Sequence, residues 1–170
     1  DTMGSLIRAH ALEWARQGRS QALSDWIEGL PAGKRQADPW LAYWYGRAWI
    51  FVRPERGRPA LERAYDAFRA ADDLRGQAQA LSTIVTGYYY EWADFRPLDR
   101  WLPEFERLLG DAAAVRLDGE SELRLRAAQL IALLFRRPEH AELTRCAQRL
   151  DQLIDAERDP NVRVMAASIL

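Results

Sequence analysis

The sequence predicts an all-α protein built from successive antiparallel helical hairpins. Apolar residues recur at helical spacing along nearly the whole chain, and no segment shows the apolar–polar alternation of a β-strand bounded by turns. Glycine, proline and aspartate separate the helical segments by short connections, as expected for helices that are antiparallel neighbours. By these signals, about nine helices are expected in the 170 residues.

Four helices are expected in the first part of the chain, over about 5–17, 20–28, 39–51 and 58–71. Gly18 is the expected end of the first helix. The third helix begins at Asp38-Pro39, where the aspartate side chain can accept a backbone N–H and the proline needs no partner for a missing one. A loop at Arg53–Arg58 is expected to separate the third helix from the fourth.

Five further helices are expected over about 73–92, 94–109, 120–135, 138–154 and from 160 onward. Asp94 is the expected cap of the sixth helix and Gly110 its expected end. Asp159-Pro160 repeats the Asp-Pro start, and the helix after it has no stop signal before the last residue. We therefore expect the chain to be a fragment of a longer protein.

The helices alternate in the width of their apolar surface. The third, fifth and seventh are apolar over wide arcs, whereas the fourth, sixth and eighth carry narrow stripes. In a stack of hairpins, the first helix of each pair packs against its partner and both neighbouring pairs, so it needs a wide arc. Helix starts also recur at roughly 34–44 residues, near the period of helix–turn–helix repeats. The pattern favours one domain over residues 1–170, a right-handed superhelix (α-α solenoid), and leaves a closed all-α bundle as the alternative.

Parts of the third and fourth helices resemble a degenerate tetratricopeptide repeat (TPR). Gly46 and Trp49 occupy positions like those of the repeat's first helix, and Ala64, Phe68 and Ala71 are similar to the A-x3-F-x2-A spacing of its second helix. In such a pair the small residues let two helices approach closely while the ring fills the remaining space. The loop at Arg53–Arg58 makes this an irregular repeat.

Two longer segments, DPWLAYWYG (38–46) and RPALERAYDAFRAADDLRG (58–76), carry a second resemblance. Over about 38–110 the chain resembles the TPR-like superhelical domain of MalT-type STAND regulators and of regulators with a bacterial transcriptional activator domain. Such regulators bind ATP through a phosphate-binding loop and DNA through a helix-turn-helix domain. This chain contains no G-x-x-x-x-G-K-[S/T] motif. The resemblance therefore implies a sensor or scaffold arm that binds a small-molecule effector or a protein partner, with no direct contact to nucleic acid. Because the sequence shows no targeting signal, we expect a cytoplasmic protein.

Composition and the reactive side chains argue against several other functions. Twenty-four basic and 25 acidic residues give a net charge of −1, without the basic excess of a nucleic-acid or anionic-membrane surface. No window has the length and apolarity of a membrane span. His10 and His140 belong to no recognisable catalytic set, and Cys146 lies within an apolar stripe, which predicts a buried, unreactive thiol. We expect no enzymatic activity, no metal and no cofactor, and the oligomeric state stays open.

Aromatic residues are the candidate binding residues, because all rings except Phe135 precede residue 106. Tyr88, Tyr89 and Tyr90 fan over about 200° of helix surface, so they cannot all face one core. These rings either fill interfaces with neighbouring helices, or some of them line a groove and grip a ligand or peptide. First helices line the concave side of TPR stacks, which selects Trp40, Tyr43, Trp44, Arg47, Tyr89, Tyr90 and Glu91 as groove candidates. Trp92 is instead expected on the buried stripe of the fifth helix.

The first functional hypothesis is a non-enzymatic sensor or scaffold domain that relays binding to attached ATPase or DNA-binding parts. The alternative is a general protein–protein interaction scaffold without a small-molecule effector. An enclosed aromatic pocket with converging polar groups would favour sensing, whereas an open surface would favour the scaffold.

Overall fold

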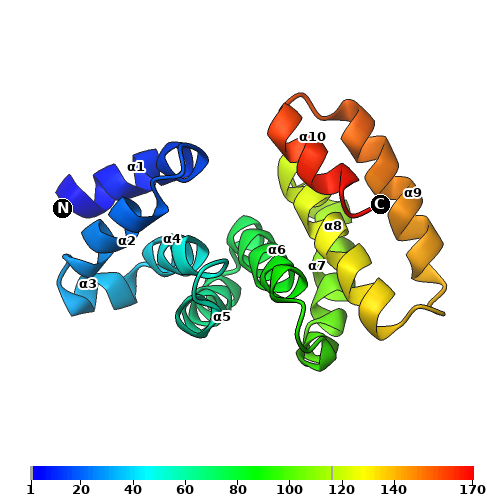
Figure 1. Ribbon diagram of the computed structural model, residues 1–170, viewed down its shortest axis with the longest axis horizontal. Coiled ribbons are helices and arrows are strands. Elements are labelled where there is room, and N and C mark those ends of the chain that lie inside the picture. Colours follow the sequence, from blue (N-terminus) through cyan, green and yellow to red (C-terminus); the bar gives the residue numbers. More distant parts are fainter. Residues whose placement is uncertain (1, 116) are drawn as a thin grey trace. The chain divides into compact units, whose positions relative to one another are not determined.

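The computed structural model describes residues 2–115 and 117–170 and confirms the all-α class (Figure 1). In this described part there are ten α-helices, one 3-10 helix and no strand. None of the described helices combines the length and the apolarity that crossing a membrane requires. The chain divides into two compact units, residues 1–76 and residues 77–170.

The first unit contains α1 (Thr2–Arg16), α2 (Ser20–Glu28), α3 (Ala32–Ala37), α4 (Pro39–Trp49) and α5 (Pro54–Ala70), and α6 (Leu74–Glu91) begins at its end. The helix α4 lies in the middle of this unit, in contact with α1, α2, α3 and, most extensively, α5. Two predicted signals are confirmed. Gly18 follows α1 with a left-handed φ of 72°, and the Asp38 carboxylate accepts the N–H of Trp40 at 3.0 Å.

The helices α4 and α5 approach closely where two glycines face each other's backbone. A Cβ added to Gly46 would lie 2.9 Å from the carbonyl oxygen of Gly57, and a Cβ added to Gly57 would lie 2.8 Å from that of Gly46. The predicted close approach at Gly46 is therefore present, and Gly57 is its partner on α5. Phe68, from the TPR-like spacing, is fully buried, whereas Ala71 is exposed just after the end of α5.

Two predictions for the first unit were wrong. The segment Arg53–Arg58 is not a loop, because α5 begins at Pro54, where the missing N–H of proline has no consequence in a first turn. The short helix α3 lies within residues expected to be a connection. Its six residues are too few to show a helical period in the sequence.

The second unit contains most of α6, the 3-10 helix η1 (Arg96–Arg100), α7 (Leu102–Val115), α8 (Gly119–Arg136), α9 (Glu142–Ala156) and α10 (Pro160–Ala167). Central in this unit is α8, which packs against η1, α7, α9 and α10. Its wide apolar arc is buried on several sides, as the sequence pattern predicted. On one side Leu123 and Leu130 of α8 belong to a core with Cys146 and Leu150 of α9 and Val162 of α10.

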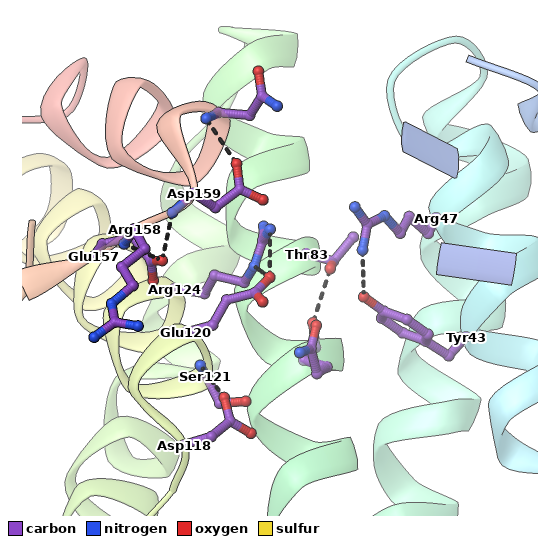
Figure 2. Close-up of polar contacts among 12 residues, drawn as sticks. Tyr43, Arg47, Thr83, Asp118, Glu120, Ser121, Arg124, Glu157, Arg158 and Asp159 are labelled. Carbon is purple, nitrogen blue, oxygen red and sulfur yellow. Dashed lines mark hydrogen bonds and ion pairs between the residues drawn. The ribbon is translucent and has the colours of Figure 1, made fainter. Parts of the chain in front are cut away.

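Two aspartates cap helices of the second unit as helix-start signals require. Asp118 accepts the N–H of Ser121 at 2.8 Å, and Asp159 accepts that of Asn161 at 2.9 Å (Figure 2). The Asp-Pro start before α10 is thus confirmed, although α10 ends at Ala167 and not at the last residue.

The predicted sixth helix over 94–109 was wrong in both its start and its end. Residues Arg96–Arg100 form a 3-10 helix, and an α-helix starts anew at Leu102. Pro103 explains the break, since proline is accommodated in a first turn but would disrupt the interior of a longer helix. Gly110 does not end α7, which continues to Val115. A glycine in a helix interior costs only about 1 kcal/mol relative to alanine, so neighbouring residues can sustain the helix through it.

Candidate functional site

The seven predicted site residues fall into two groups, one in each unit. Trp40, Tyr43, Trp44 and Arg47 lie on α4 in the first unit, and Tyr89, Tyr90 and Glu91 lie at the end of α6 in the second. The two groups are described separately below.

Two rings of the α4 group belong to the core of the first unit. Tyr43 and Trp44 are buried, and their rings pack edge-on with centroids 5.0 Å apart. Arg47 lies over the Trp44 ring at 5.3 Å and donates a hydrogen bond of 3.2 Å to the Tyr43 hydroxyl (Figure 2). Because helices surround α4, rings on several of its sides are covered. Their burial favours the interface-filling interpretation for Tyr43 and Trp44.

Trp40 is the more accessible ring of this group. It is half-buried and packs edge-on against two rings. Its ring centroid lies 4.8 Å from that of Phe68 and 5.6 Å from that of Tyr43. It also lines a depression of about 410 Å³ together with Lys34 and Asp38. The indole therefore joins the core on one side and an accessible surface on the other.

The second unit brings together five aromatic rings, which we name the α6 aromatic cluster: Tyr89, Tyr90, Trp92, Phe95 and Phe135. The Phe95 ring stacks on that of Phe135, with centroids 4.0 Å apart and an angle of 10° between the ring planes. The Trp92 ring packs edge-on against two others. Its centroid lies 5.2 Å from that of Phe135 and 5.7 Å from that of Tyr89. Tyr90 and Trp92 are each 62% exposed, so these two rings form the accessible face of the cluster.

The position of Trp92 corrects a sequence prediction. We expected Trp92 on the buried stripe of a helix, but α6 ends at Glu91 and Trp92 adopts a left-handed φ of 49°. This turn in the chain takes the indole out of the helical register and leaves it exposed. A bulky residue in that conformation costs about 1–2 kcal/mol, and such strain concentrates at functional positions. An exposed, strained tryptophan is therefore the strongest local indication of a binding role in the second unit.

Charged side chains hold the backbone around the cluster. The Arg136 guanidinium donates hydrogen bonds of 2.9 and 2.5 Å to the two carboxylate oxygens of Asp99, which joins η1 to α8. Arg96 binds both carboxylate oxygens of Asp94 in the same way. These hydrogen bonds lower the pKa of Asp99 and of Asp94. The pairs thus help to position Phe95, which lies between Asp94 and Asp99 in the chain, against Phe135 at the end of α8.

The reactive side chains have local structural contacts. His10 stacks on Trp14 at 5.5 Å, and Nδ1 of His140 accepts the N–H of Glu142 at 3.2 Å. Among the described residues, no three histidine, cysteine, aspartate or glutamate side chains are grouped so as to hold a metal ion. Cys146 is fully buried, as predicted, and its thiol donates a hydrogen bond to the Arg126 carbonyl oxygen at 3.4 Å.

We expect the Cys146 thiol to react slowly in the folded protein. Burial raises the pKa of Cys146 from 9.0 to about 11. Because the thiolate is the reactive form, this leaves about 100-fold less reactive species at pH 8, and burial slows access further. Ellman's reagent should modify Cys146 at least about 100-fold more slowly in the native protein than in guanidinium chloride. Equal rates in the two conditions would contradict this prediction.

No protein-family model, curated protein or solved structure matches this chain. The resemblance to MalT-type regulators therefore stays a prediction.

Sequence reasoning missed three members of the α6 aromatic cluster: Trp92, Phe95 and Phe135. Tyr89 and Tyr90 were found because consecutive rings cannot share one core face. Phe135 is 40 residues or more along the sequence from the other rings of the cluster, so only the packing of α8 brings it to them. The isolation of this ring in an otherwise aliphatic segment was the one available signal.

Proposed function

We propose that this chain is a non-catalytic, TPR-like sensor or scaffold domain of a bacterial transcriptional regulator, which binds a regulatory protein through the α6 aromatic cluster. In this proposal the helical hairpins belong to a right-handed superhelix, and the resemblance over about 38–110 supplies the type of regulator. A bound partner stabilises one packing of the hairpins over others, and this biases the attached ATPase or DNA-binding parts.

The observation that carries the proposal is the exposure of Tyr90 and Trp92, at 62% each, on a base of three further rings. Tryptophan and tyrosine are the side chains most enriched among residues that dominate protein–protein binding energy. Each buries a large apolar area and offers an N–H or O–H group at its edge. The accessible face is open, which favours a protein partner at this surface over an enclosed small molecule.

The partner can be identified by site-specific photo-crosslinking in cells. A photoreactive phenylalanine analogue placed at Tyr90 should crosslink a defined protein. The same analogue at Phe51 is the matched control, because Phe51 is an aromatic residue of similar exposure (52%) in the first unit. Crosslinking of the same proteins from both positions would contradict a specific surface at the α6 aromatic cluster.

The captured partner should then bind the Trp92→Ala variant about 30-fold more weakly, the loss typical of a dominant interface residue. Phe51→Ala should bind like the original protein. Trp92→Gly separates lost contact from lost folding, because glycine adopts a positive φ without strain and should be about 1 kcal/mol more stable than alanine at this position. Undiminished binding by both Trp92 variants, in surface plasmon resonance on folded protein, would remove this surface from the proposal.

A further inference from the structure

A hollow of about 350 Å³ lies in the first unit where α2, α3, α4 and α5 meet. Ile27 and Leu41 contribute apolar surface to its lining. Three alanines, Ala42, Ala60 and Ala67, occupy positions on α4 and α5 where larger side chains would fill the space. The small side chains at these three positions therefore leave this space open.

Two arginines from different helices line the same hollow: Arg35 of α3 and Arg63 of α5. Within the described residues, neither side chain has a hydrogen-bond or ion-pair partner. No carboxylate is among the residues that line the hollow. Several other guanidinium groups are matched to carboxylates, as in the pair between Arg124 and Glu120 at 2.9 Å (Figure 2). The unmatched positive charge is thus concentrated at an apolar hollow.

Tyr45 gives the hollow a fixed wall. Its hydroxyl donates a hydrogen bond of 2.9 Å to Glu28 and accepts one of 2.7 Å from Arg56. Arg56 in turn binds Glu28 at 2.7 Å and lies over the Trp49 ring at 4.3 Å. These contacts join α2, α4 and α5, so the ring keeps its position without a ligand.

We propose that this hollow binds a small amphipathic organic anion, a molecule with a carboxylate or phosphate group on an apolar body. Guanidinium groups bind carboxylates and phosphates through paired, charge-assisted hydrogen bonds. The alanines, Ile27 and Leu41 in its lining suit an apolar body, and ligand pockets start at roughly 300 Å³. A hollow of about 350 Å³ fits a small molecule, not a partner helix, which would need a long continuous groove. This inference goes beyond the proposed protein partner and uses residues of the first unit, whereas the α6 aromatic cluster belongs to the second. An experiment can therefore contradict one proposal without contradicting the other.

Calorimetric titration of the 170-residue chain with four eight-carbon probes tests the ligand class. Octanoate and octyl phosphate should bind, and octan-1-ol should bind at least about tenfold more weakly, because it lacks the charge-assisted hydrogen bonds. Octylammonium should not bind. Equal affinity for octan-1-ol and octanoate, or no binding of either anion, would overturn the proposal.

Substitutions locate the site. Arg35→Gln and Arg63→Gln should each weaken octanoate binding about tenfold, whereas Arg53→Gln, which removes the same charge at the start of α5 outside the hollow, should not. Ala67→Trp should block the hollow, and Ala70→Trp is its control, because both alanines are exposed on α5 and only Ala67 lines the hollow. Thermal unfolding checks that each variant is folded. An equal loss in Arg53→Gln, or an acidic amphipathic peptide that binds through these arginines while the small anions do not, would contradict the assignment.

Discussion

Phe68→Ala is expected to reduce the free energy of unfolding by about 3–5 kcal/mol, the range for removing a buried phenylalanine ring. Phe68 is fully buried on α5, and its ring meets Trp40 edge-on at 4.8 Å. The surroundings cannot close around the space, since the nearby atoms belong to three helices, α4, α5 and the first turn of α6. Urea unfolding followed by circular dichroism measures the loss.

A double-mutant cycle with Gly76 tests the reason for this loss. A Cβ on Gly76 would lie 2.3 Å from Cδ1 of the Phe68 ring, so Gly76→Ala alone should cost about 1–3 kcal/mol. Without the ring the clash disappears, and alanine is the better helix former. Gly76→Ala should therefore be neutral or stabilising, by up to about 1 kcal/mol, in the Phe68→Ala background. Additive effects in the two backgrounds would show that Phe68 and Gly76 are not packed as described.

Gly57→Ala is the second substitution with a large expected effect, a loss of about 2–3 kcal/mol. A Cβ at this position would lie 2.6 Å from the backbone nitrogen of Ile50 and 2.7 Å from its Cα. All the close atoms belong to the backbone, so no side-chain rotation relieves the clash, and α5 must move away from α4. The same urea titration measures this cost.

Gly110→Ala is the matched control for Gly57→Ala. Both glycines lie inside α-helices, but nothing lies within 4 Å of a Cβ placed at Gly110. Alanine there should stabilise the protein by up to about 1 kcal/mol through its helix propensity. If both substitutions change stability in the same direction, the close approach of α4 and α5 is not what requires glycine at position 57.

The location of most helices was accessible from local sequence. Asp38 and Asp159 start helices through their own carboxylates, and Gly18 ends one through its own backbone, so each signal acts over a few residues. The errors in helix boundaries also span only a few residues. Pro54 starts α5 where a loop over Arg53–Arg58 was expected, and Gly110 lies within a helix that it was expected to end.

The candidate sites depended on contacts that no local pattern contains. Trp92 has the spacing of a buried residue, and only the end of α6 at Glu91 and a left-handed turn expose it beside Phe135. For Tyr43 and Trp44 the sequence left core packing and groove lining open, and only the helices around α4 show that both rings are buried.

Periodicity and capping residues alone specify an all-α chain of short-linked helices with a buried Cys146, because hydrogen bonds along a helix and its first turn join residues close in sequence. Packing between helices decides the rest: the facing glycines 46 and 57, the α6 aromatic cluster, and the hollow at Arg35 and Arg63. Each joins side chains from different helices, so burial and charge pairing there depend on distances between helices, which the order of residues along one helix does not encode.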